Sequence, residues 1–205
     1  TEVTGFEAHS SATHRGVNAV MIAADLIVFL SAKAAEMRRR GDPDSGFDPP
    51  YTSVHVGTVE GGTALNIIPA RCGFQWEYRL MPEADPREII EAFEAYATSL
   101  IPAMRAVAEG AGIRTETRAQ VPGLVVEDAS PAERLVMALT GDNRAIKVSY
   151  GTEAGKFQEA GASTVICGPG HIDQAHKPNE YIDLAQIEAC EAFMRRLMER
   201  LQSPL

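Results

Sequence analysis

Three of the five histidines lie in segments that suit the display of functional side chains. His9, His171 and His176 occupy irregular stretches rich in Gly, Ser and Pro, where a rigid scaffold usually presents catalytic and binding residues. His55 instead falls within an alternating strand pattern, which favours a structural role, and His14 lies in a polar loop, which favours a solvated one. Catalytic hypotheses therefore concern His9, His171 and His176.

The chain offers fewer metal ligands than a hydrolytic centre needs. A catalytic zinc takes about three protein ligands and keeps an open position. The sequence has no HExxH motif, and the carboxylates with metal-site spacing to His176 are limited to the weak candidates Asp173, Glu180 and Glu153. It also lacks a nucleophile elbow, a P-loop and a GxGxxG motif, so nothing supports covalent serine hydrolysis or nucleotide chemistry. We expect no complete metal site within this chain.

The first 120 residues predict six elements in the order strand, helix, strand, strand, helix, strand. The expected elements are a strand within 1–8, a helix over 16–40, strands over 51–59 and 72–80, a helix over 86–107 capped by Asp85, and a strand over 112–121. The first helix has apolar residues at helical spacing that predict one buried stripe, namely Val17, Met21, Ala24, Ile27 and Val28. This order predicts an α+β ferredoxin-like (βαββαβ) sandwich.

The remaining residues follow a different pattern. It predicts a helix capped by Ser130, a short strand, a loop-to-helix segment over 151–161, an apolar strand over 164–167, and a last helix from about Asp183 to about Leu201. Short apolar strands between helices are typical of a parallel sheet, but two strands cannot form one that is covered on both faces. We therefore expect the end of a larger α/β domain whose earlier strands precede Thr1.

Composition narrows the class of protein and its partners. The 45% hydrophobic and 23% charged residues are typical of a globular chain with enough apolar side chains for a core. A net charge of −9 disfavours nucleic acid and anionic membranes as partners. The three cysteines are widely spaced and form no CxxC pair, and no apolar run approaches the length of a membrane span, so we expect a cytoplasmic protein.

Four segments, taken together, resemble the acetylornithine deacetylase and aminoacylase-carboxypeptidase family of zinc amidohydrolases. The segments read GFEAHSS over 5–11, NIIPA over 66–70 with Arg79 downstream, GTEAG over 151–155, and GPGHIDQAHKPNEY over 168–181. Their order and their spread over most of the chain make the resemblance more specific than any one of them. It covers the C-terminal portion of that family, including its dimerisation domain.

The resemblance implies two domains and a shared metal centre. Residues 1–120 would be a ferredoxin-like dimerisation (lid) domain that forms a homodimer. Residues 121–205 would be the C-terminal segment of the metal-dependent catalytic domain, with its N-terminal part absent from the chain. His176 would be the last ligand to one or two zinc ions, with cobalt as a possible substitute. The other ligands and the glutamate that activates water would lie outside this chain, so the isolated chain is expected to be inactive.

The resemblance also implies a role for each remaining site residue. His9 would enter the active site of the other subunit and donate a hydrogen bond to the oxyanion. Asn66 and Arg79 would hold the substrate carboxylate, for which the planar guanidinium fork is well suited. Backbone and hydroxyl donors to a carboxylate would come from Gly151, Thr152 and Gly155.

Simpler alternatives exist for four of these residues. His9 could be a solvated histidine at a strand end, and Arg79 could form a surface ion pair. Asn66 could belong to a turn, and Thr152 could serve only to cap a helix.

The implied reaction is metal-dependent hydrolysis of an N-acyl amino acid, above all N2-acetylornithine to ornithine and acetate in arginine biosynthesis. Succinyl-diaminopimelate desuccinylase, aminoacylase and dipeptidase share the same framework and are alternatives. A further alternative is a noncatalytic dimerisation or binding module that pairs through an edge strand or a helix face. A small-molecule sensing domain of the same fold would use Arg79 without His9.

Overall fold

The computed structural model describes residues 1–82 and 84–202. It separates into two compact units. Residues 1–120 together with Lys147–Gly151 form the first unit, and Val121–Ile146 with the residues from Thr152 onward form the second. No helix in the described part of the chain combines the length and the apolar character that a membrane crossing requires.

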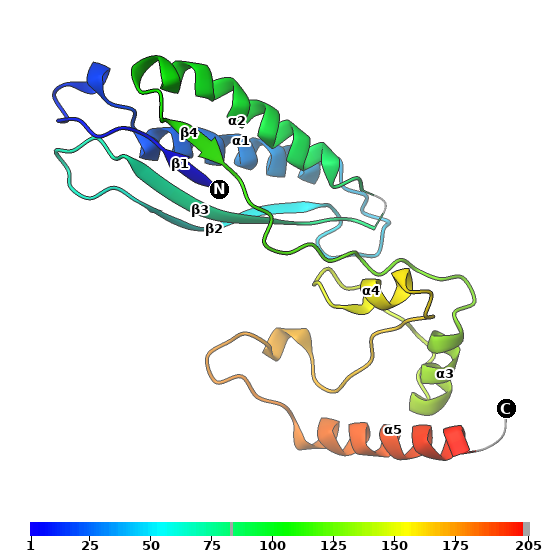
Figure 1. The fold of residues 1–205 in the computed structure, drawn as a ribbon. Helices are drawn as coiled ribbons and strands as arrows, with labels where there is room; N and C mark the ends of the chain where they lie inside the picture. The colour runs from blue at the N-terminus through cyan, green and yellow to red at the C-terminus, as the bar shows by residue number, and fades with distance from the viewer. Residues whose placement is uncertain (83, 203–205) are drawn as a thin grey trace. The chain divides into compact units, whose positions relative to one another are not determined.

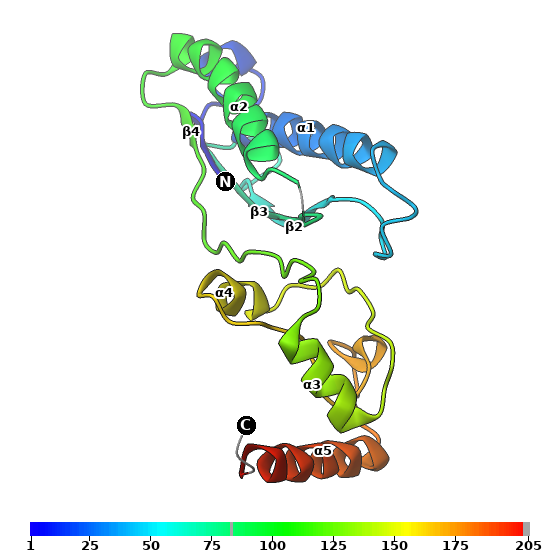
Figure 2. The same ribbon diagram turned by 90° about the vertical axis from the view of Figure 1, so that its right-hand side faces the viewer.

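The first unit confirms the predicted ferredoxin-like order. Its elements are β1 (Glu2–Thr4), α1 (Ala19–Arg39), β2 (Ser53–Gly61), β3 (Arg71–Arg79), α2 (Arg87–Val107) and β4 (Gly112–Arg114), with a short 3-10 turn, η1 (Thr13–Arg15), before α1. The strands lie in the order β2-β3-β1-β4, and every pair is antiparallel. Both helices cover one face of this sheet (Figure 1, Figure 2).

The core lies between the sheet and the two helices. Along β3, Cys72 and Phe74 are buried, whereas their neighbours Arg71 and Gln75 are exposed. This is the alternation that the sequence predicts for a strand with one covered face. The ring of Phe93 in α2 packs between aromatic side chains from the sheet and from α1, namely Phe74, Trp76 and Phe29.

The buried stripe predicted for the first helix is only partly correct, because Val17 is buried and Ile27 packs half-buried against the core, whereas Met21, Ala24 and Val28 are exposed. The residues that α1 buries are Ala19, Ala23, Leu26, Leu30 and Met37. Met21 and Val28 are instead exposed at 66% and 67% of their surface. Residues 19–30 are almost all apolar, so their spacing fits more than one helix face, and packing on the sheet decides which face is covered.

Strand lengths differ from the prediction where no partner is present. The strand expected over 112–121 is limited to Gly112–Arg114, which pairs with the three residues of β1. Because a strand is defined by its ladder of hydrogen bonds, the alternating residues beyond Arg114 do not extend it.

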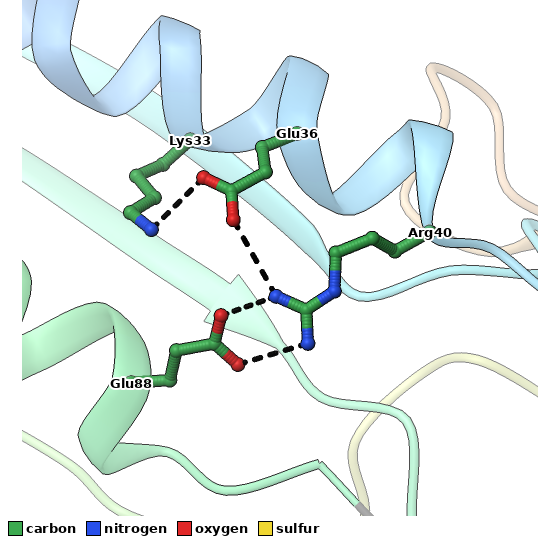
Figure 3. A network of polar contacts seen from close by, with 4 residues as sticks. All are labelled: Lys33, Glu36, Arg40 and Glu88. Carbon is green, nitrogen blue, oxygen red and sulfur yellow. Dashed lines mark hydrogen bonds and ion pairs between the residues drawn. The ribbon is translucent and has the colours of Figure 1, made fainter.

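An ion-pair network joins the end of α1 to the beginning of α2 (Figure 3). Arg40 contacts both carboxylate oxygens of Glu88, with 3.1 Å from Nη2 to Oε2, and its Nη1 lies 3.5 Å from Glu36. Lys33 Nζ donates to Glu36 at 2.9 Å. These bonds hold the pKa of Glu88 and of Glu36 below the ordinary glutamate value. Arg40 and Glu88 are exposed and Lys33 and Glu36 are half-buried, so the network contributes mainly to how the helix ends are arranged.

The regular elements that the structure describes in the second unit are all helical. They are α3 (Pro131–Thr140), α4 (Ala154–Glu159), the 3-10 turn η2 (Ile172–Gln174) and α5 (Leu184–Gln202). Ser130 caps α3 as predicted, since its Oγ accepts from the amide of Glu133 at 3.3 Å. Asp183 caps α5 by accepting from the amide of Ala185 at 3.0 Å.

Neither strand predicted for the second unit forms within the described residues. Residues 164–167 and the segment before Gly151 have no strand assignment. A strand requires at least one hydrogen-bonded neighbour, and the described residues supply none to these segments. In addition, α5 buries none of its described residues, and Leu184 and Met198 on it are exposed.

Candidate functional site

Two of the predicted site residues, His9 and Asn66, lie together in the first unit. His9 forms an isolated antiparallel bridge with Ile67, and the amide of Ser10 donates to the carbonyl of Asn66 at 3.0 Å. Next to them, the amide of Ile68 donates to Ala8 at 2.8 Å, and the Ile68 side chain is buried. The segment after β1 and the loop between β2 and β3 are therefore fastened to each other at one end of the sheet (Figure 1).

The hydrogen bonds of His9 determine which of its ring nitrogens can donate. Nδ1 lies 3.2 Å from the amide nitrogen of Ser11 and 2.8 Å from the Ser11 hydroxyl. A backbone N–H can only donate, so Nδ1 is an acceptor, and in the neutral imidazole the hydrogen is on Nε2. His9 is exposed, so this Nε2–H can reach a ligand. Ser11 was not among the predicted site residues, although it lies in the GFEAHSS segment.

Asn66 also has the turn role that its simpler alternative predicts. It precedes Ile67 in a turn in which the amide of Ile67 donates to the carbonyl of Ala64 at 3.3 Å. The Asn66 residue itself is exposed. The backbone thus holds the turn next to His9, and Asn66 stays accessible to solvent.

Arg79 lies at the other end of β3, on the sheet face that the helices leave open. Its Nη2 donates to Glu77 at 2.9 Å, which is the surface ion pair that the simpler alternative predicts. A Cβ placed on Gly151 would lie 2.8 Å from Arg79 Nη1, so the guanidinium occupies the space beside this glycine. Arg79 and Gly151 therefore form a second pair of predicted site residues.

The two pairs are far apart within one chain. Arg71 pairs with Thr4 at the beginning of β3, next to the His9 segment, whereas Arg79 pairs with Ser53 at its end. The nine residues of β3 span roughly 26 Å at about 3.3 Å per residue. One small substrate cannot contact His9 and Arg79 of the same chain at once.

The glycine-flanked segment over 151–155 ends inside a helix. Thr152 Oγ1 accepts from the amide of Ala154 at 3.2 Å, as the helix-start alternative predicts. A hydroxyl group that accepts one hydrogen bond can still donate its own hydrogen to a ligand. Gly155 is buried in α4, and a Cβ there would lie 2.1 Å from the carbonyl oxygen of Pro122, so only glycine fits.

His176 lies in an exposed polar loop, away from any apolar interior. Its backbone has a φ of 58°, which is uncommon for a residue other than glycine. Its amide donates to the carboxylate of Glu180 at 2.8 Å. His171 has a structural role, because its Nδ1 accepts from the amide of Asp173 and caps η2.

His176 could supply one ligand to a metal centre, but the residues around it do not supply a complete set. Across residues 1–82 and 84–202, no group of three or more His, Cys, Asp or Glu side chains is placed to hold a metal ion. A catalytic zinc takes about three protein ligands. The described residues therefore suit a zinc site only as a part of it.

Comparison with known proteins gives the family of the chain. Residues 1–105 match the peptidase dimerisation domain family. The chain is 34% identical to the acetylornithine deacetylase of Myxococcus xanthus over 202 residues, covering 95% of this chain and 50% of that protein. It is 30% identical to the acetylornithine deacetylase of Proteus mirabilis over 197 residues, covering 96% and 49%. The chain thus spans about half the length of these curated relatives.

Solved structures show the same fold. A tripeptidase from Staphylococcus aureus superposes with a TM-score of 0.62 at 21% identity, covering 94% of this chain and 48% of that one. A metallo-carboxypeptidase from Sulfolobus solfataricus superposes with a TM-score of 0.59 at 17% identity, covering 95% and 57%. Together with the ferredoxin-like first unit, the family match and the curated relatives show that the chain belongs to the peptidase dimerisation domain family and resembles about half the length of acetylornithine deacetylases.

Proposed function

We propose that this chain is the C-terminal half of a metal-dependent amidohydrolase that cleaves an N-acyl amino acid, with N2-acetylornithine as the first candidate. The acetylornithine deacetylases of M. xanthus and P. mirabilis, which match nearly the whole chain, support this substrate. The observation that carries the proposal is the exposed Nε2–H of His9, whose ring is oriented by the Ser11 hydrogen bonds and whose backbone is fastened to Asn66 and Ile67.

In this reaction His9 would stabilise the charge that develops on the amide carbonyl. The imidazole is fixed through Nδ1 before substrate arrives, so Nε2–H donates to the oxyanion without reorganisation. Such a preorganised donor typically contributes about 10²–10³-fold to kcat. Arg79 would bind the substrate carboxylate through its guanidinium, exchanging its exposed contact with Glu77 for the ligand.

The proposed roles of the two units follow the sequence prediction. Residues 1–120 would be the dimerisation (lid) domain, and residues 121–205 would complete a catalytic domain that begins before Thr1. Two features support the second role. The described residues after Arg114 form no strand, and α5 leaves its apolar residues uncovered. Both are expected of a segment that packs on a sheet supplied by other polypeptide.

His176 would provide one ligand to a centre of one or two zinc ions, for which cobalt could substitute. Its left-handed backbone supports a functional role, because such conformations gather at binding sites. When bound, zinc would polarise the scissile carbonyl and lower the pKa of a water molecule. The residues of this chain would hold and orient the substrate around that centre.

The separation of the two pairs supports a homodimer with shared active sites. Since His9 and Asn66 lie at one end of β3 and Arg79 and Gly151 at the other, each active site would take one pair from each subunit. Pairing would use the unpaired outer edge of β2 together with the exposed face of α1 that carries Met21 and Val28. An unpaired edge strand is a ready site for pairing with a second copy.

Complementation between two inactive variants of the full-length protein tests this arrangement. We expect His9→Ala and Arg79→Ala each to abolish most activity in a homodimer. The two chains are then co-expressed with different tags, and the doubly tagged dimer is isolated. One of its sites carries both substitutions and the other carries neither, so it should regain half of the parental activity. A dimer of two differently tagged His9→Ala chains is the control and stays inactive.

An inactive heterodimer would show that His9 and Arg79 serve the same site in one chain. An active His9→Ala homodimer would remove the catalytic role of His9. Zinc content separates the hydrolase from a noncatalytic dimerisation module. If the protein is a hydrolase, we expect His176→Ala to reduce the amount of bound zinc, whereas a noncatalytic module binds no zinc in either form.

Assays with N-acetyl, N-succinyl and dipeptide substrates distinguish acetylornithine deacetylation from the related activities.

A further inference from the structure

A short stretch of the second half of the chain packs on the first unit. Residues Lys147–Gly151 belong to the first unit, whereas Ile146 before them and Thr152 after them belong to the second. The glycine-flanked segment over 151–155 therefore begins on one unit and continues in the other. The contacts that fasten 147–151 decide where this segment starts.

Two hydrogen bonds and a ring contact fasten residues 147–151 to the loop between α1 and β2. Lys147 Nζ donates to the carbonyl of Ser45 at 2.6 Å, and Ser149 Oγ donates to the carbonyl of Asp48 at 2.6 Å. Lys147 Nζ also lies 5.3 Å from the centroid of the Phe47 ring, within the range of a cation–π interaction. Both donors come from side chains, so these bonds depend on the residue types at 147 and 149.

The receiving loop is shaped by its own hydrogen bonds. The amide of Asp42 donates to the carbonyl of Pro50 at 2.9 Å, which closes the loop at its base. The amide of Phe47 donates to Ser45 Oγ at 3.3 Å. Gly46 has a φ of 77°, a left-handed conformation that glycine adopts at little cost, and it lies against the Lys147 side chain. The loop thus presents its carbonyl groups from a defined backbone.

The fastened segment ends against the guanidinium of Arg79. The space in which a Gly151 Cβ would lie is filled by Arg79 Nη1, 2.8 Å from that position. On the other side, Arg79 Nη2 is held by Glu77. A shift of residues 147–151 would therefore remove one of the two surfaces that orient the guanidinium.

We propose that Lys147 and Ser149 are positioning residues for substrate carboxylate binding. They hold Gly151 against Arg79, so that the guanidinium and the start of the 151–155 segment form one anion-binding element. The substrate role of this element rests on the proposed function above, whereas the anchoring of residues 147–151 does not. Two experiments examine these parts separately.

Tryptic cleavage of the 205-residue chain tests the anchoring without any enzyme activity. Trypsin must bind the Lys147 side chain in its specificity pocket before it cuts the following peptide bond. The contacts of Lys147 with Ser45 and Phe47 compete with that binding. We expect Ser149→Ala to accelerate cleavage after Lys147 about three- to tenfold, the range that the loss of one hydrogen bond produces. Cleavage after Arg144, which lies outside the anchored segment, serves as the internal reference and should not change.

Ser99→Ala is the matched control variant for this experiment. Ser99 Oγ also donates to a backbone carbonyl at 2.6 Å, that of Tyr96, but it lies in α2. Cleavage after Lys147 should remain at the parental rate in this variant. Equal rates in Ser149→Ala and the parent would overturn the proposal, whatever the activity of the full-length protein.

Kinetics of the full-length protein test the link to the carboxylate. We expect Ser149→Ala and Lys147→Met to raise KM for an N-acyl amino acid about three- to tenfold and to leave kcat nearly unchanged. For an N-acyl amine that lacks the carboxylate, KM should not change. In an Arg79→Ala background the effect of Ser149→Ala should disappear, because both act through the same guanidinium.

A rise in KM of the same size for both substrates would overturn the positioning role. A full-length protein that hydrolyses no N-acyl substrate, while cleavage after Lys147 still depends on Ser149, would refute the proposed function and leave the anchoring established.

Discussion

Phe93 lies at the centre of the first unit's core, where its ring is only 1% exposed. Its centroid is 4.8 Å from that of Trp76, 6.3 Å from that of Phe29 and 6.4 Å from that of Phe74. A buried aromatic side chain removes at least about 150 Å² from water, which at about 25 cal/mol per Å² amounts to about 4 kcal/mol. We therefore expect Phe93→Ala to lower the free energy of unfolding by about 3–5 kcal/mol.

Urea unfolding of the 205-residue chain measures this loss. Trp76 is the only tryptophan of the sequence and lies in the first unit, so its fluorescence reports on that unit alone. Because Phe93 is next to it, far-UV circular dichroism is recorded in parallel to correct for a changed emission baseline. A domain of this size has about 5–15 kcal/mol of stability, so the predicted loss is a large fraction of the total.

Two further variants make the result decisive. Phe93→Leu keeps most of the volume and should cost less than about 1.5 kcal/mol. Phe6 belongs to the same unit but is 52% exposed, so Phe6→Ala should cost less than about 1 kcal/mol. A Phe93→Ala loss no larger than that of Phe6→Ala would refute the assignment of Phe93 to the core.

Three other predictions concern titration, thiol reactivity and capping. Arg40 holds the pKa of Glu88 below its ordinary value, so this carboxylate stabilises the fold above about pH 4.3 and loses that effect as the pH falls through its folded pKa. Urea midpoints of Glu88→Gln should thus lie below those of the parent at pH 7 and converge with them once the pH lies below the folded pKa of Glu88; a constant offset would contradict this. Burial raises the pKa of the Cys72 thiol, whereas Cys167 is exposed, so iodoacetamide should label Cys167 in the native chain and Cys72 only in urea, as mass spectrometry of tryptic peptides would show. Ser130→Ala removes the cap of α3 and should cost about 1–2 kcal/mol, measured by circular dichroism of the helical second unit; an unchanged transition would rule out a stabilising cap.

Local signals in the sequence were enough to predict the elements of the first unit and the beginnings of several helices. Asp85, Ser130 and Asp183 each accept a hydrogen bond from a backbone amide two or three residues later. Such caps depend on neighbouring residues alone, so a short window of sequence contains all that determines them. The alternation along β3 is similar, because one covered face repeats every second residue.

The segments quoted for the family resemblance were also visible in the sequence, but their arrangement was not. Motif matching treats Asn66 and Arg79 as partners on one carboxylate, although the predicted strand over 72–80 already separates them along the chain. The pairing of β3 with β1 and β2 shows which other segments lie at each end of that strand. The register of a sheet is set by contacts between distant segments, which a linear motif does not contain.

The same distinction explains where the sequence prediction was wrong or silent. Residues 19–30 are apolar on several helix faces, and the contact of α1 with the sheet selected Leu26 and Leu30 for burial in place of Met21 and Val28. The strand expected over 164–167 has the right composition but no neighbour to complete its hydrogen bonds. The anchoring of Lys147 to Ser45, about 100 residues away along the chain, has no local signature at all. The sequence by itself therefore determined the order of helices and strands in the first unit, where several helices begin and where the chemical groups occur, because those properties are local. Only the tertiary structure decided which faces are buried and which groups meet, because these depend on contacts between residues far apart in the chain.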